Sequence, residues 1–162
     1  MHHTISVLVV NQSGVLSRIS GLFSGRGFNI ESLNVAETND SGISRMTIVT
    51  RGDDKKIEQV TKQLNKLVDI IKVIDLTEEH FVDRELILVK MNAEARVREE
   101  ILRIVDIFRA KVIDVSPDTY TVEITGDEGK TKGFLDLLKP LGIKEVVRSG
   151  RIAISRGIKP IN

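Results

Sequence analysis

Cysteine and tryptophan are absent from this chain of 162 residues, and its aromatic residues are scarce, with five phenylalanines and one tyrosine. Without cysteine, the chain can form no disulfide bond, no thiolate metal site and no cysteine nucleophile. So few aromatics disfavour base stacking, in which nucleic-acid-binding sheets use aromatic side chains. The lack of cysteine is compatible with a reducing compartment, and we expect a cytoplasmic protein.

Neither sign of charge dominates, because 24 basic and 23 acidic residues leave a net charge of +1. This balance gives no electrostatic basis for binding nucleic acid or an anionic membrane. No apolar run approaches the roughly 20 residues that span a bilayer. Met1 leads directly into a strand-like segment, so we expect no signal peptide. With 41% hydrophobic and 29% charged residues, the composition predicts a soluble globular protein.

The first half of the chain predicts one β-α-β-β-α-β unit. β-Branched and apolar runs predict strands at 4–10, 28–37, 44–50 and 70–76. Apolar residues at helical spacing predict a helix over 14–25, ended by Gly25 and Gly27, and a second helix that opens at 52–54. Asn39-Asp40-Ser41-Gly42 is a hairpin signal between the two middle strands.

The second half repeats this order, with strands at 85–91, 111–115, 120–125 and 143–155, the last broken at Ser149-Gly150. One helix carries the apolar stripe from Val97 to Phe108, with Asn92 as its cap; a short helix around Phe134 stops at 140–142. The chain therefore predicts an α+β fold of two tandem ferredoxin-like domains, each an antiparallel sheet with helices on one face. We place the domains at 1–77 and 83–157 and expect the tail 157–162 to fray.

The loop between the first strand and the first helix is the main candidate site. Small polar residues and Gly14 leave backbone N–H groups at a helix N-terminus, where the helix dipole favours a carboxylate. Asn11, directly after the strand, could hold an ammonium group through its carbonyl oxygen. Together these groups match the zwitterionic end of an amino acid. The alternative is a plain helix cap with Ser13 as N-cap.

The other candidate residues offer fewer groups for binding or catalysis. Asn29 follows Gly27-Phe28 as a turn residue, and it could add a second amide to the same pocket if two copies pair through this edge. We interpret His2, His3 and His80 as exposed, solvated side chains. No His/Asp/Glu set has zinc spacing, and no serine lies in a nucleophile-elbow context, so we expect no metal site and no catalytic residues.

Three other classes remain as alternatives. The β-α-β-β-α-β order also occurs in RNA-recognition modules, but those need aromatics on the middle strands, and 44–50 carries none. A small α+β enzyme would need an acid–base or metal constellation. A stand-alone amino-acid sensor or transcription regulator is the nearest rival, although no DNA-binding helix pair is present.

The runs NQSGVLSRISGLFSGRGFNIESLNVAET, SRMTIVTRGD and IEQVTKQLNKLVDIIKVIDL resemble the small regulatory subunits of acetolactate synthase (acetohydroxyacid synthase). The resemblance continues through RELILVKM, IFRAKVIDVSPDTYTVEITG and RSGRIAISRG, so it covers almost the whole chain. It implies that the first domain is an ACT domain and that the second is a related ferredoxin-like domain. It also implies a non-catalytic protein that binds and activates the large catalytic subunit and confers feedback inhibition by valine.

The same resemblance implies the partners and the site. Thiamine diphosphate, Mg²⁺ and FAD belong to the large subunit, and this chain needs no cofactor of its own. The effector lies between two ACT domains of a homodimer. It contacts Asn11, Gly14 and Val15 of one copy and Asn29 and Ile30 of the other, with Leu16 as a wall. Whether valine, isoleucine or leucine binds best stays open.

Overall fold

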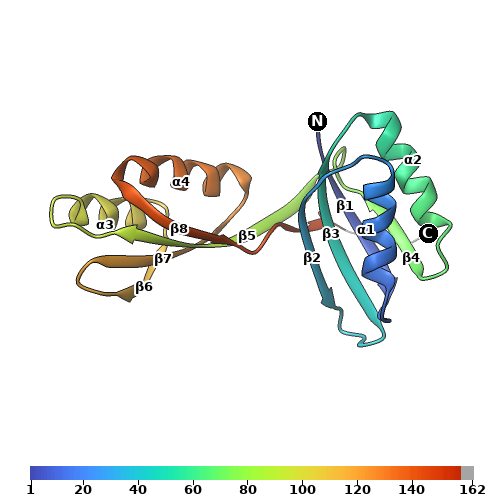
Figure 1. Cartoon of the computed structure of the whole chain (residues 1–162), viewed down its shortest axis with the longest axis horizontal. Coiled ribbons are helices and arrows are strands. Elements are labelled where there is room, and N and C mark those ends of the chain that lie inside the picture. Colours follow the sequence, from blue (N-terminus) through green and yellow to red (C-terminus); the bar gives the residue numbers. More distant parts are fainter. Residues whose placement is uncertain (158–162) are drawn as a thin grey trace. The chain divides into compact units, whose positions relative to one another are not determined.

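The computed structural model describes residues 1–157, which form two compact units (Figure 1). The first unit contains Met1–Val82 together with the described residues from Arg151 on, and the second contains Asp83–Gly150. These units differ from the predicted domains at residues 151–157, which group with the first unit. The tail that was predicted to fray lies, except for Gly157, outside the described residues.

The first unit is a four-stranded antiparallel sheet in the order β2-β3-β1-β4, with two helices on one face. Its elements follow the predicted β-α-β-β-α-β order: β1 (His2–Val10), α1 (Val15–Gly25), β2 (Ile30–Glu37), β3 (Ile43–Arg51), α2 (Asp54–Asn65) and β4 (Ile70–Asp75). Strands β2 and β4 are the edges of this sheet, so each keeps one side without a strand partner among these four.

Strand alternation separates the two faces of this sheet. One face carries Ile5, Val7 and Val9 of β1, which pack with Met46 and Ile48 of β3. Against them lie the apolar stripes of the helices: Val15, Ile19 and Phe23 of α1, and Ile57, Val60 and Leu64 of α2. This two-layer core follows directly from the period of two in strands and 3.6 in helices.

Helix α1 ends in a Schellman motif, which sets where β2 begins. Gly27 has φ 74, its N–H donates to Ser24 O at 3.1 Å, and the Phe28 N–H donates to Phe23 O at 3.0 Å. The rings of Phe23 and Phe28 meet edge to face, with centroids 6.3 Å apart. These are the two hydrogen bonds and the apolar contact of that motif. They direct the chain into Asn29 and the start of β2.

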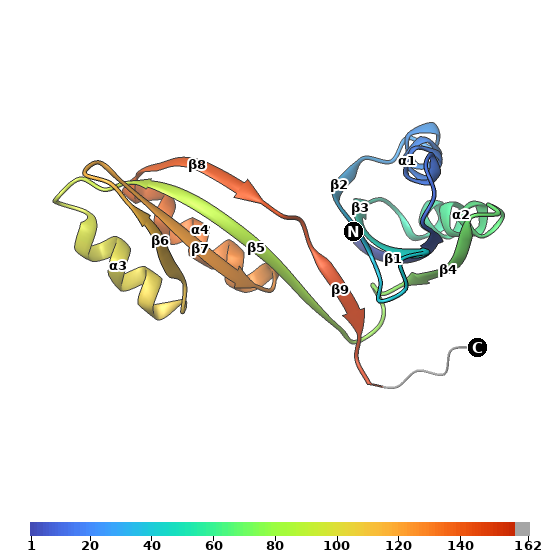
Figure 2. The same ribbon diagram turned by 90° about the horizontal axis from the view of Figure 1, so that it is seen from below.

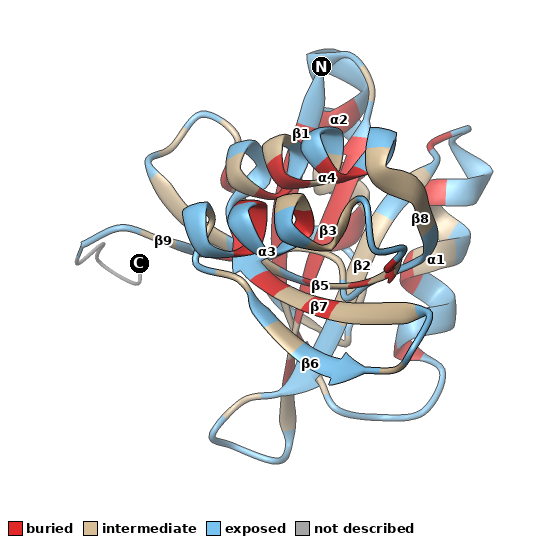
Figure 3. Cartoon of the chain, turned by 90° about the vertical axis from the view of Figure 1, so that its left-hand side faces the viewer, coloured by how far each residue is buried: buried red, intermediate tan, exposed pale blue. Residues whose placement is uncertain are grey.

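The second unit repeats the architecture with the strand order β6-β7-β5-β8. Figure 3 shows buried residues on the sides of α3 and α4 that face the sheet. The elements are β5 (Phe81–Asn92), α3 (Arg98–Ile107), β6 (Lys111–Val115), β7 (Thr119–Gly126), α4 (Glu128–Gly142) and β8 (Ile143–Arg148). The chain then forms β9 (Ile152–Ser155), which pairs with β5.

Two local predictions in this unit are wrong. Asn92 caps no helix, because it still pairs with Thr119 as the last residue of β5; α3 begins at Arg98 without a side-chain cap. The helix around Phe134 was predicted to be short, but α4 has 15 residues. The carboxylate of Asp127 accepts the Lys130 N–H at 2.9 Å, and this cap starts the helix well before its apolar stripe. The predicted stop at 140–142 is confirmed, since α4 ends at Gly142.

Candidate functional site

The first turn of α1 presents backbone donors without acceptors. Gly14 is the N-cap residue, with φ 86 and ψ −13, and no side chain caps the helix. Among residues 1–157, no acceptor meets the N–H groups of Val15 and Leu16. The alternative of a helix cap at Ser13 is therefore wrong, because the left-handed backbone of Gly14 takes the N-cap position instead. An anion is a suitable partner for donors of this kind.

Asn11 is held beside this turn by the β2–β3 hairpin. Its side-chain amide donates to Glu37 Oε1 at 3.1 Å and to Ser41 O at 2.9 Å, and its backbone N–H donates to Gly42 O at 2.9 Å. Both amide hydrogens are therefore engaged, and among the described residues no donor reaches Oδ1. That oxygen is available for an ammonium group.

Glu37 is a residue of this site that the sequence pattern did not single out. It ends β2, it is exposed, and it places a carboxylate against Asn11. The only sequence signal was its position immediately before the hairpin turn. Glu37 orients the Asn11 amide and adds negative charge near Oδ1, and both effects favour a cationic group there.

The side chains around Gly14 divide the turn into a buried and an open part. Val15 is 3% exposed and packs in the core, so only its backbone faces outward. Leu16 is 43% exposed and offers an apolar surface beside the free donors. A Cβ placed on Gly14 would lie 3.3 Å from Arg18 Nη1, and the guanidinium of Arg18 pairs with Asp69. Side-chain space at position 14 is thus limited on the Arg18 side.

Asn29 and Ile30 lie at the other end of the sheet from Asn11. Ile30 pairs with Thr50, and Thr50 pairs with His3 at the start of β1, whereas Asn11 follows Val10 at its end. The seven steps along the chain from His3 to Val10 span about 23 Å in an extended strand. A single chain therefore does not bring the two halves of the predicted site together. Thr50 Oγ1 donates to Asn29 O at 2.8 Å, which leaves the exposed Asn29 side chain outside this bond.

His3 departs from its interpretation as an exposed side chain, because it is only 3% exposed. Its Nε2 lies 3.3 Å from Asp54 Oδ1 and its Nδ1 lies 3.5 Å from Asp75 Oδ2. The alternation of β1 turns His3 toward α2 and β4, which the sequence near Met1 does not reveal. His2 and His80 are exposed as expected.

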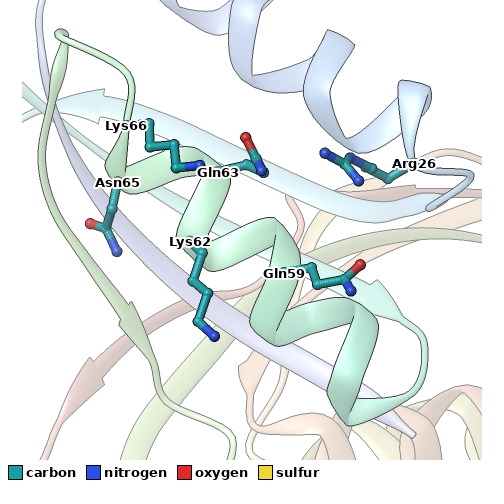
Figure 4. Close-up of a pocket in the computed structure, with 6 residues that line it drawn as sticks. All are labelled: Arg26, Gln59, Lys62, Gln63, Asn65 and Lys66. Atoms are coloured by element: carbon teal, nitrogen blue, oxygen red, sulfur yellow. The ribbon is translucent and has the colours of Figure 1, made fainter.

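A concave surface, separate from the turn at Gly14, lies between the end of α1 and α2 (Figure 4). It has a volume of about 490 Å³, and the residues that line it are three cationic and three amide residues, whose aliphatic stems also contribute to the surface: Arg26, Gln59, Lys62, Gln63, Asn65 and Lys66. Lys62 also bonds Glu58 at 2.9 Å, and this hydrogen bond and charge lower the pKa of the Glu58 carboxyl. Figure 4 shows Lys62 and Asn65 directed away from Arg26. None of the predicted site residues lines this groove.

Within residues 1–157, no three His, Asp or Glu side chains gather in a way that could hold a metal ion. Across the same residues, no helix is both long and apolar enough to cross a membrane.

Comparisons with known proteins match nearly the whole chain. A family model described as the small subunit of acetolactate synthase matches residues 84–157, and one described as an AHAS small subunit-like ACT domain matches residues 5–72. The acetolactate synthase small subunit of Aquifex aeolicus is 56% identical over 155 residues, covering 95% of this chain and 81% of that protein.

Two further relatives extend this picture. A probable acetolactate synthase small subunit of Archaeoglobus fulgidus is 54% identical, covering 98% of this chain and 99% of that protein. The crystal structure of the acetolactate synthase small subunit of Thermotoga maritima superposes with a TM-score of 0.87 at 40% identity, covering 98% of this chain and 99% of that one. Sequence, family models and fold agree over both units, and the chain belongs to the family of acetolactate synthase small subunits.

Proposed function

We propose that this chain is the non-catalytic regulatory subunit of an acetolactate synthase. It binds the large catalytic subunit, raises its activity and makes it sensitive to inhibition by valine. The cofactors of the reaction, thiamine diphosphate, Mg²⁺ and FAD, are held by the large subunit. The observation that carries the proposal is the uncapped first turn of α1 beside the oriented amide of Asn11, in a chain of this family. Family membership also favours this role over nucleic-acid binding or independent catalysis.

The effector seat, which we define as Asn11, Gly14, Val15 and Leu16, matches the groups of a free amino acid. The N–H groups of Val15 and Leu16 donate to the carboxylate, which the positive end of the α1 dipole also attracts. Asn11 Oδ1 accepts from the ammonium group, and Glu37 adds its charge nearby. The exposed side of Leu16 contacts the branched aliphatic side chain.

Pairing of two chains through β2 would complete the seat. Strand β2 is an edge of its sheet, and an unpaired edge is a template for another strand. Antiparallel pairing of two β2 strands lays the Ile30 end of one copy beside the Glu37 end of the other. Glu37 contacts Asn11, so Asn29 and Ile30 of the second copy arrive next to the effector seat of the first. This arrangement explains why one chain separates the two halves.

Regulation requires that valine bind two arrangements of the dimer with different affinity. A ligand at the boundary between two copies meets this requirement, because its contacts on both sides depend on how the copies are packed. Binding then favours one packing, and the large subunit responds to that packing.

Reconstitution with the cognate large subunit tests the proposal. Acetolactate formation from pyruvate is followed while the chain and then valine are titrated. We expect turnover to rise on addition of the chain and to fall with valine, and the purified chain alone to give no product. Isoleucine and leucine, titrated in parallel, rank the effectors. Unchanged turnover in the presence of the chain, with no response to valine, contradicts the proposed function.

A further inference from the structure

The chain returns from the second unit as a strap, residues 151–155, that lies on the first unit. Its backbone is held by polar side chains of β2 and β3. The Arg151 N–H donates to Ser32 Oγ at 3.1 Å, Asn34 Nδ2 donates to Arg151 O at 3.3 Å, and Arg45 Nη2 donates to Ala153 O at 3.4 Å. Just beyond the strap, the Arg156 N–H donates to His80 O at 3.0 Å. Residues on both edges of the strap thus fix its path.

These anchors belong to the face of the sheet opposite the helices. Ser32 pairs with Val49, and Asn34 pairs with Thr47, whereas the core face carries Leu33 and Ile48. Figure 2 shows β9 on the side of this sheet away from α1 and α2. Arg45 also donates to Ser6 Oγ at 3.0 Å, so one guanidinium joins β1, β3 and the strap. Thr4, Ser6, Thr47 and Val49 on this face are also buried.

The family model and the contacts of the strap assign it to different parts of the chain. The family model of the C-terminal domain includes it, since that match runs from 84 to 157, yet its contacts place it in the first unit. Covalently it follows Gly150, the last residue of the second unit, which has φ 83.

Strand β2 connects the strap to the predicted effector contacts. Asn29 immediately precedes β2 and Ile30 begins it, and the strap anchors Ser32 and Asn34 follow within four residues of Ile30, roughly 13 Å along an extended strand. At its other end, Glu37 holds Asn11 of the effector seat. Because Ser32 and Asn34 belong to β2, a displacement of this strand would change the geometry of their hydrogen bonds to Arg151.

We propose that the strap couples the effector seat to the C-terminal unit, in that docking of residues 151–155 on Ser32, Asn34 and Arg45 depends on effector occupancy. The inference rests on the proposed function, because it takes valine as the effector. Coupling between two sites is reciprocal, so a strap that responds to valine must also influence valine affinity. A typical coupling of this kind changes affinity fivefold or more.

Hydrogen exchange of the full chain bound to its large subunit tests the coupling. We expect valine to change the exchange rate of the segment 151–156 at least fivefold in the unaltered chain. In the double variant Ser32→Ala, Asn34→Ala, this segment exchanges faster without valine, and inhibition by saturating valine is reduced at least fivefold, while activation without valine is retained. The control Ile152→Ala, Ile154→Ala changes outward side chains of β9, which are 56% and 55% exposed, and should behave like the unaltered chain.

Calorimetry with valine separates the possible failures. If valine binds and inhibits, but exchange at 151–156 does not change and the double variant is inhibited normally, the coupling is wrong and the proposed function stands. If valine does not bind the unaltered chain, the proposed function fails and the coupling fails with it. Circular dichroism establishes that each variant is folded. If the first pair misfolds, Ser32→Gly, Asn34→Asp is a second pair that removes the Ser32 hydroxyl acceptor and the Asn34 amide donor.

Discussion

At the scale of single residues, Gly14 is the position where backbone conformation and ligand chemistry meet. Its φ of 86 lies in the left-handed region, which side chains other than glycine rarely adopt, and its open side exposes the donors of Val15 and Leu16. A side chain here would both strain the turn and occupy the space in front of those donors. The effector seat therefore depends on the absence of a side chain at one position.

Gly14→Asp should weaken valine binding at least about a hundredfold. Two negative charges about 4 Å apart repel by roughly 4 kcal/mol at an effective dielectric near 20, and the neighbouring guanidinium of Arg18 offsets part of that repulsion. Calorimetry with valine measures the effect. Gly21→Asp is the matched control, because Gly21 lies on the same helix with open space around it and should leave the affinity unchanged. Equal valine affinities in both variants would show that valine does not bind at the turn of Gly14.

His3 concerns stability rather than ligand binding. His3→Ala leaves a cavity and removes the group between the carboxylates of Asp54 and Asp75, so we expect the free energy of unfolding to fall by about 2–4 kcal/mol. His2→Ala, at the exposed neighbouring position, should cost less than about 1 kcal/mol, since its partner Glu31 is reached at the surface. Urea denaturation compares the two variants. Equal losses would show that burial of His3 contributes nothing.

At the scale of elements, helix boundaries are set by caps rather than by apolar stripes alone. Asp53 accepts the Lys56 N–H at the start of α2, and Asp127 does the same for Lys130 at the start of α4. Helix α1 lacks such a side chain and is capped by the backbone of Gly14 alone. Helix α3 also begins without a side-chain cap. The missing cap alone therefore does not mark the effector seat, and α1 differs by the left-handed backbone of Gly14 and by the neighbouring Asn11 amide.

Asp127→Ala should lower the free energy of unfolding by about 1 kcal/mol, because the Lys130 N–H loses its acceptor. Asp136→Ala on the exposed side of the same helix, paired with Lys132 at 3.7 Å, should cost less than about 0.5 kcal/mol. Thermal or urea unfolding followed by circular dichroism measures both. A larger loss for Asp136→Ala would show that the cap is not what stabilises the start of α4.

At the scale of the whole molecule, the edge strand β2 links assembly to effector binding. If two copies pair through β2 to complete the effector seat, then weakening that pairing must weaken valine binding as well. Dimer dissociation and loss of affinity should therefore appear together in one variant, and neither should appear when a comparable change is made elsewhere.

Val35→Glu places a charge on the edge strand β2 at a side chain that is 42% exposed, and a charge on an edge strand disfavours pairing with another strand. We expect sedimentation velocity to show a shift toward monomer at micromolar concentration, and calorimetry to show at least about a tenfold loss of valine affinity. Val68→Glu is the control, because Val68 is 97% exposed and lies outside the strands. A monomeric Val35→Glu variant that binds valine normally would place the complete effector seat within one chain.

Local patterns in the sequence determined most of the secondary structure. Alternating apolar residues and helical stripes gave both β-α-β-β-α-β units, because burial of one face imposes periods of two and 3.6 on the chain. The same patterns located the strand-to-helix loop with Gly14 and Asn11. They could not assign Asn92 to a strand or find the start of α4, because those depend on pairing with Thr119 and on the cap of Asp127.

Features that depend on contacts between residues far apart in the sequence were decided by the tertiary structure alone. Three features of the first unit depend on residues far apart in the sequence, so no local pattern encodes them. They are the burial of His3, the hydrogen bond from Asn11 to Glu37, and the distance between Asn29 and Asn11. The strap is the clearest case. Residues 151–155 have the alternation of an ordinary final strand, but hydrogen bonds to Ser32, Asn34 and Arg45 place them on the first unit, because the polar side chains of that sheet face offer partners for their backbone.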